Sequence, residues 1–465
     1  MAFRAPLGFA LMVIGVALSG GGCTCSRGND AGAGEAGSGD PDGAAASTDA
    51  GESGGLSAPI AAARIEAGDV VVAGLDVPAK AIRVQRINPN DEVTIDRTIL
   101  EGVKWSSESD LKVVPAARGV AITWRGLRSG KLVRQMIVLG PDLAPKGEII
   151  DVAAASCATR DALWFTDGKR VHGRPWSGAA IKSALPHDQD AALVCGQHRA
   201  FALLDEEEGT AVMVLGGGAD SDAGADAGRG AGRDATRVSD GGKVVASSSA
   251  ISLLKESEFG EDDQRERAEY TAGDDLGVVR LAASGAIAMR EVKAGIAGPL
   301  RRLKTTIPRD DDVVAVDASA REVVVVFTED VGEACPGAGG TTVPSTRVKA
   351  LRIDRTSFEE SIVELSGGIC GREVGPFFTG SLREDVSVAW VERVPVKGQS
   401  RAPVAGLAHR LVVAAGPPAD LLRADQPADA LVDAGCDEAH CYAVALARRP
   451  GMDAMVPGFA RVIRY

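Results

Sequence analysis

Short apolar runs, each bounded by Gly, Pro, Asp or Asn, recur along most of the chain. They are rich in Val, Ile and Leu, a composition and length typical of β-strands. Stretches with apolar residues at helical spacing are scarce, and the charged stretch 256–269 is expected to be a loop or at most one exposed helix. The pattern predicts an all-β protein. The clearest runs are 69–75, 119–126, 134–140, 312–318, 322–330, 387–394 and 409–415.

The runs repeat with a period near 40 residues. Each repeat has a strand with a bulky apolar residue near its end, then a short polar turn, then a second strand. Periods of about 40 to 45 residues built of short strands are typical of β-propellers, whose four-stranded blades bury their faces only against neighbouring blades. We predict a β-propeller of about seven blades (six to eight); the alternative is one or two β-sandwiches. The marking residues are Val84, Trp124, Trp164 and Leu204, followed less regularly by Phe327, Trp390 and Leu446.

Two segments are poor in large apolar residues and rich in Gly, Ala, Ser and Asp. The first, within 23–58, contains Leu56 as its one large apolar residue. Such composition cannot bury enough surface to offset the entropy of ordering, so we predict a flexible linker there and a disordered insertion at 216–242. The predicted organisation is therefore a signal peptide at 1–22, the linker at 23–58 and a propeller-like domain at 59–465 that contains the insertion.

The first residues have the pattern of an export signal. Arg4 precedes an unbroken apolar run of 12 residues, Leu7 to Leu18. This run is too short for a bilayer about 30 Å thick but suits the apolar middle of a secretory signal. One cleavage site follows Ser19, because Ala17 and Ser19 are small residues at alternate positions.

The competing cleavage site, which we favour, lies just before Cys23. The stretch Leu18-Ser19-Gly20-Gly21-Gly22-Cys23 resembles the lipobox of bacterial lipoproteins, although Gly20 stands where that family usually has Leu. The resemblance implies that Cys23 becomes the lipidated first residue of the mature chain. It also implies a protein of the bacterial cell envelope, held to a membrane by its lipid and facing the periplasm or the cell surface.

Beyond Cys23 and Cys25 there are six cysteines, an even number, which in an exported protein favours disulfides. Six cysteines allow 15 connectivities, and pairing between sequence neighbours is the simplest. Disulfide chemistry is favoured over metal binding, because only His440 lies close to a cysteine pair. The expected pairs are Cys157–Cys195, Cys335–Cys370 and Cys436–Cys441.

The charge distribution argues against a nucleic-acid partner. The formal net charge is −13, and Lys and Arg form no basic stripe that could bind phosphates. Matches to nucleotide-binding, hydrolase and calcium-loop patterns fall at 32–37, 51–55 and 220–226, inside the low-complexity segments, and lack the flanking structure that those motifs require. We nominate no catalytic residue, metal ligand or cofactor.

These features predict an exported, lipid-anchored envelope protein whose propeller loops bind or scaffold an envelope protein or glycan without catalysis. The alternative is an exported propeller enzyme, a hydrolase or lyase, with its active site in the central channel. Propellers serve both purposes, so the fold alone does not separate them.

Overall fold

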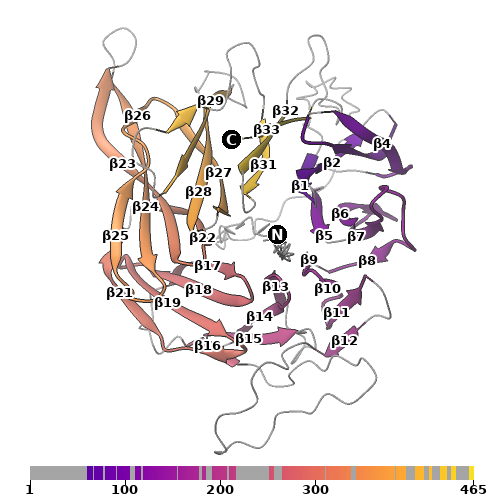
Figure 1. Ribbon diagram of the computed structural model, residues 1–465, viewed down its shortest axis with the longest axis horizontal. Helices are drawn as coiled ribbons and strands as arrows, with labels where there is room; N and C mark the ends of the chain where they lie inside the picture. The colour runs from indigo at the N-terminus through magenta and orange to yellow at the C-terminus, as the bar shows by residue number, and fades with distance from the viewer. Residues whose placement is uncertain are drawn as a thin grey trace, which may run out of the picture.

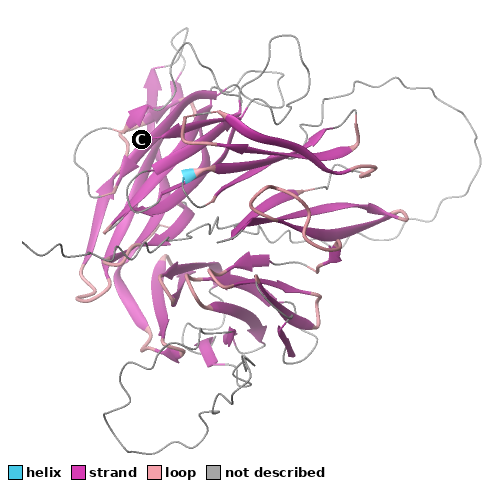
Figure 2. Ribbon diagram, turned by 45° about the vertical axis from the view of Figure 1, so that its right-hand side comes forward, coloured by secondary structure: helices cyan, strands magenta, loops and turns pink. Residues whose placement is uncertain are grey.

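The computed structural model describes residues 60–464 with internal gaps. The predicted signal peptide, linker and insertion, Cys23 among them, lie outside the described residues. Within the described part the chain forms strands and loops, with a helical turn at Gly68 and no α-helix (Figure 2). No described helix could span a bilayer. The gaps are 66–67, 77–78, 91, 105–109, 117–118, 154–155, 177–180, 185–190, 207–208, 216–250, 256–263, 309–310, 337–341, 383, 394–403, 413–417, 421–429, 437–440 and 447–459.

The described strands form eight antiparallel sheets, which we name A to H in chain order. Sheet A contains β1 (Ile60–Arg64), β2 (Val70–Asp76), β3 (Ala81–Ile87) and β4 (Val93–Leu100). Sheet B contains β5 (Leu111–Ala116), β6 (Gly119–Arg128), β7 (Lys131–Leu139) and β8 (Ile150–Asp151). Sheet C contains β9 (Ser156–Ala158), β10 (Ala162–Thr166), β11 (Arg170–Pro175) and β12 (Ile181–Ala184). Sheet D contains β13 (Ala191–Cys195), β14 (Ala200–Glu206), β15 (Gly209–Leu215) and β16 (Ile251–Lys255).

The remaining four sheets follow the same order. Sheet E contains β17 (Gln264–Ala272), β18 (Asp275–Ala282), β19 (Ala286–Lys293), β20 (Ile296–Ala297) and β21 (Arg301–Thr306). Sheet F contains β22 (Asp312–Ala318), β23 (Glu322–Pro336), β24 (Thr342–Asp354), β25 (Glu360–Glu364) and β26 (Ile369–Cys370). Sheet G contains β27 (Glu373–Leu382), β28 (Asp385–Arg393), β29 (Val404–Leu411) and β30 (Ala419–Asp420). Sheet H contains β31 (Ala430–Cys436), β32 (Cys441–Leu446) and β33 (Ala460–Arg464).

The sheets follow one another around a ring (Figure 1). The first strand of each sheet contacts the first strand of the next, from β1 through β5, β9, β13, β17, β22 and β27 to β31, and β31 contacts β1. This closed cycle of small antiparallel sheets confirms the predicted β-propeller, and eight sheets lie at the upper end of the expected six to eight.

The core consists of separate apolar layers between neighbouring sheets. On β6, Val120, Ile122 and Trp124 pack against sheet A, whereas Ala121 packs toward sheet C. Comparable layers lie between sheets C and D, D and E, E and F, and F and G. Because both faces of a central strand are covered, these strands are continuous apolar runs rather than alternating ones.

The repeat found in the sequence corresponds to one strand position in each sheet. Six of the seven marking residues lie on the second strand of their sheet: Trp124, Trp164, Leu204, Phe327, Trp390 and Leu446. The first five of these are buried. Val84 is the exception, because it lies on β3, the third strand of sheet A. The even spacing at Val84 is therefore not structural equivalence, and the regular repeat begins at Trp124.

The expectation of a loop or helix at 256–269 is wrong from residue 264 onward, where β17 begins. Its charged residues alternate with Ala268 and Tyr270, which are buried. Arg267 and Glu269 form an ion pair with each other at 2.8 Å, so the charged side of this strand compensates its own charge. Such pairing makes a highly charged sequence compatible with an inner strand.

Sheets A and H complete the ring by packing alone. Each sheet is built from consecutive strands, and no described strand of one pairs with the other. Val70 and Val72 of sheet A pack with Val444 and Val462 of sheet H. We call this contact the closing seam.

Candidate functional site

The six cysteines of the propeller form the three disulfides expected from their order. Cys157–Cys195 joins the first strands of sheets C and D, with the Cα atoms 5.7 Å apart. Cys335–Cys370 lies within sheet F, and Cys436–Cys441 closes the turn between β31 and β32. Among the described residues, no three His, Cys, Asp or Glu side chains converge as metal ligands.

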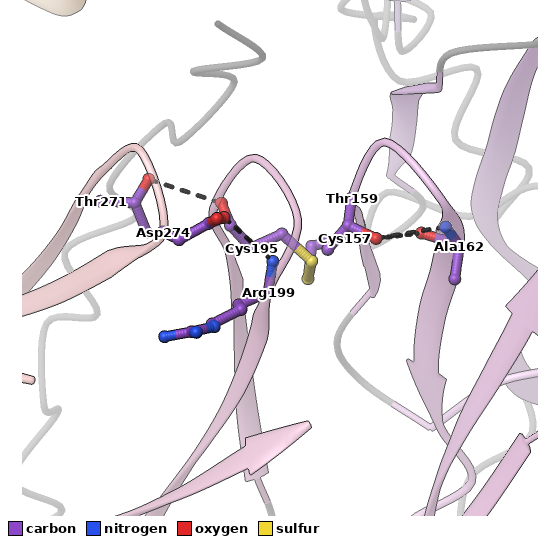
Figure 3. The surroundings of a disulfide bond; sticks show 7 residues. All are labelled: Cys157, Thr159, Ala162, Cys195, Arg199, Thr271 and Asp274. Carbon is purple, nitrogen blue, oxygen red and sulfur yellow. Dashed lines mark hydrogen bonds between the residues drawn. A yellow bond between two sulfur atoms is a disulfide. The ribbon is translucent and has the colours of Figure 1, made fainter. Parts of the chain in front are cut away.

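The Cys157–Cys195 disulfide belongs to a wider link between three sheets (Figure 3). The turn that follows Cys195 is held by the next hairpin: Gln197 N donates to Gly273 O at 2.9 Å, and His198 N donates to Asp274 Oδ1 at 2.5 Å. Thr271 Oγ1 also donates to the carbonyl of Cys195 at 3.4 Å. Covalent and hydrogen bonds thus connect sheets C, D and E.

A buried ionic cluster joins sheets E and F. The Arg355 guanidinium, between β24 and β25, contacts Glu291 at 2.7 Å and Asp275 at 3.1 Å. Tyr270 Oη donates to Glu291 Oε1 at 3.1 Å, and Lys293 pairs with Glu291 at 2.8 Å. Arg355 therefore pairs across the layer with two acids of sheet E, whereas Lys293 and Glu291 pair within β19.

Near neutral pH, Tyr270 in this cluster stays protonated and Glu291 stays ionised. Burial raises the pKa of Tyr270 well above its usual value, and the nearby Glu291 carboxylate adds to the rise. Burial also acts to raise the pKa of Glu291, but hydrogen bonds from Lys293 and Arg355 outweigh it, so the net pKa is lowered. A neutral phenol and an ionised carboxylate suit a structural clamp better than acid–base chemistry, which needs a pKa near the working pH.

Asp317 is the group best placed for proton exchange near neutral pH. It lies on β22, the inner strand of sheet F, and hydrogen-bonds to Thr379 on the inner strand of sheet G. Ala318 N donates to its Oδ1 at 2.8 Å. Burial raises the pKa of Asp317 to about 6, although both hydrogen bonds lower it. The partners given for this carboxyl, the Thr379 side chain and the Ala318 amide, define no reaction class by themselves.

A groove between sheets A and B is the candidate ligand site. Its volume is about 380 Å³, within the range of about 300 to 1,000 Å³ common for small-molecule sites. Trp124, Leu127 and Ile149 supply apolar lining, and Trp124 itself is buried between the two sheets. A second cavity, between sheets E and F, holds only about 20 Å³, room for one water at most.

Polar groups complete the groove. Lys104, Arg128 and Gln135 line it together with Glu101. Asp151 orients two of them, because Arg128 contacts it at 3.1 Å and Gln135 Nε2 donates to it at 3.1 Å. Aliphatic side chains and a few fixed polar groups can hold a small polar ligand such as a sugar or a short peptide.

Glycine at position 126 keeps the floor of the groove open. A Cβ there would lie 3.2 Å from Lys104 O and 3.4 Å from Trp124 Cδ1, tighter than most real contacts. Sequence reasoning identified Trp124 as a repeat position but missed the groove. Its lining residues come from the connection after β4 and from sheet B, and no local motif joins them.

No protein-family model and no curated protein matches the chain. Solved structures are similar at the level of the fold. A structure from a study of two prolyl endopeptidases is 12% identical, covering 84% of this chain and 54% of its own, with a TM-score of 0.46. The β-propeller domain of the Trilobed protease from Pyrococcus furiosus is 9% identical, covering 76% and 92%, with a TM-score of 0.38. The Aleuria aurantia lectin is 12% identical, covering 68% and 96%, with a TM-score of 0.28. The chain thus spans about half the length of the first of these.

Proposed function

We propose that this protein is an exported, lipid-anchored component of the bacterial cell envelope whose propeller binds an envelope ligand without catalysis. The observation that carries the proposal is the apolar run Leu7 to Leu18, followed by small residues and Cys23. The disulfides agree with it, because such bonds persist in oxidising compartments. The groove between sheets A and B supplies a place for the ligand.

The anchor is tested by labelling growing bacteria with an alkyne analogue of palmitate. The wild-type chain is expected to take up the label, and Cys23→Ser is expected to lose it. Cys25→Ser is the matched control, two residues away, and should remain labelled. An unlabelled wild-type chain whose intact mass begins at Gly20 would refute lipidation and favour cleavage after Ser19.

The groove is tested by capturing components of an envelope extract on the immobilised protein. Gln135→Ala combined with Lys104→Ala should reduce the capture of any component bound at the groove. Lys131→Ala, on β7 but outside the groove, should not. Equal capture by all three proteins would exclude the groove as the ligand site.

The alternative, an exported enzyme, has one specific observation in its favour. Asp317 lies on an inner strand with its pKa raised by burial to about 6, as a general acid or base requires. Loss of a measured hydrolase or lyase activity in Asp317→Asn, with the fold retained, would favour the enzyme over the binding protein.

A further inference from the structure

The groove between sheets A and B contains two opposite charges that do not pair with each other. Glu101 and Lys104 both line it, three positions apart on the segment between β4 and β5, and both are exposed. Within the described part of the chain, neither side chain forms an ion pair or a hydrogen bond. A carboxylate and an ammonium in the same groove are therefore both available to a ligand.

Hydrogen bonds to both sheets hold this segment in place. Val103 N donates to Lys80 O, in the turn between β2 and β3, at 2.8 Å. Leu127 N, on β6, donates to Lys104 O at 2.8 Å. Between the two charges, a Cβ at Gly102 would meet no atom within 4 Å, so open space lies beside the main chain there. A segment fixed before binding lowers the entropic cost of holding a ligand.

The other two charges at the groove already compensate each other. Arg128 Nη1 contacts the Asp151 carboxylate at 3.1 Å, and Gln135 Nε2 donates to the same carboxylate at 3.1 Å. This leaves Arg128 and Asp151 close to neutral as a pair. The uncompensated charges of the groove are therefore the carboxylate of Glu101 and the ammonium of Lys104.

The apolar lining favours an aliphatic group over a sugar ring. Leu100, Leu127 and Ile149 line the groove, and Ile149 is 39% exposed, one of four large apolar side chains exposed among the described residues. Trp124 is only 1% exposed, so its indole offers no open face on which a sugar ring could stack. No other residue that lines the groove is aromatic.

We propose that the groove binds a short peptide with free ends and an aliphatic side chain, its ammonium facing Glu101 and its terminal carboxylate facing Lys104. Such a ligand brings one charge of each sign and matches the two charges that lack partners, whereas a neutral sugar leaves both unpaired. The inference rests on the proposed function in one respect, that the groove is the ligand site. It is independent of the lipid anchor.

The experiment is isothermal titration calorimetry of the full chain, purified in detergent, with the dipeptide alanyl-leucine. Three comparison ligands are used: N-acetyl-alanyl-leucine lacks the ammonium, alanyl-leucine amide lacks the carboxylate, and diacetylchitobiose represents a neutral sugar. Alanyl-leucine should bind, and diacetylchitobiose should not. Blocking either end of the dipeptide should weaken binding about fivefold, an effect typical of a partly exposed ion pair.

Two variants assign the ends of the peptide. Glu101→Gln should weaken binding of alanyl-leucine about fivefold and leave the affinity for the acetylated peptide unchanged. Lys104→Gln should weaken binding of alanyl-leucine by a similar factor and leave the affinity for the amide unchanged. Glu359→Gln and Lys131→Gln change exposed charges outside the groove, so these matched controls should bind as the wild type does.

Three results would overturn the inference. Equal affinity for the three peptides would overturn the match of charges, and alanyl-leucine binding that neither groove variant weakens would place the peptide elsewhere. No binding of alanyl-leucine would overturn the peptide class, and binding of diacetylchitobiose in its place would leave the groove as a sugar site. Capture from the envelope extract and labelling of Cys23 test the proposed function separately, since either can fail while the dipeptide still binds.

Discussion

Asp317 offers a quantitative test of the contact between sheets F and G. Its pKa rises from 3.8 to about 6 because burial disfavours the ionised form. A pKa difference of about two corresponds to a free-energy difference of about 3 kcal/mol between the two protonation states. The side chain keeps partial access to solvent, so we expect about 1 to 3 kcal/mol.

The protonation of Asp317 is linked to folding, and this linkage sets how the free energy of unfolding changes with pH. A raised folded-state pKa stabilises the fold at pH values below the unfolded pKa, and this contribution is lost as the pH rises through about 6. Asp317→Asn cannot ionise, so its stability relative to wild type should increase between pH 4 and pH 7.5 by about 1 to 3 kcal/mol.

The assay is urea unfolding of both proteins across this pH range, followed by the difference between their free energies of unfolding. Other carboxyl groups titrate equally in both proteins and cancel. Thr379→Val is the companion variant: it removes a hydrogen bond that lowers the pKa of Asp317, so the loss of stability should move to higher pH. A difference between wild type and Asp317→Asn that is the same at pH 4 and pH 7.5 would refute the reasoning.

Two further predictions concern links between sheets. The double variant Cys157→Ser/Cys195→Ser opens a loop of 38 residues, and its free energy of unfolding in urea should fall by about 4 kcal/mol. The variant has no disulfide between sheets C and D left to reduce, so adding reductant should change no contact between them. Equal stability of variant and wild type would contradict a stabilising role for this disulfide. Arg355→Ala leaves Glu291 buried beside a single lysine and should cost about 3 to 5 kcal/mol, and adding Glu291→Gln should restore part of the loss, as measured by thermal unfolding; no recovery would show that the arginine acts through packing instead.

Much of the fold could be predicted from the sequence because the propeller is built from local elements. Six of the seven repeat residues mark the second strand of their sheets, and the spacing from Trp124 to Trp164 to Leu204 reflects the length of chain needed to build one sheet. Val84 shows the limit of such counting, since an apolar residue on a neighbouring strand can continue a spacing by coincidence. The disulfide pairs could be predicted for the same reason, because each joins cysteines that are neighbours in chain order.

The candidate sites could not be predicted from the sequence in this way. The groove depends on the distance between two sheets, and the Arg355 cluster joins residues 64 and 80 positions apart. Asp317 is one acid in an apolar run, and its raised pKa comes from neighbours on another sheet. Charge and spacing along a sequence do not report which faces of distant strands meet.

The closing seam has a consequence for how the chain reaches its native state. Every described ladder joins strands of the same sheet, so hydrogen bonding can be completed one sheet at a time, at a small loop-closure cost for each. Only the side chains around Val72 and Val444 must find partners from opposite ends of the domain. A polypeptide that crosses a membrane unfolded could therefore assemble in the order in which it emerges, with the ring closing last.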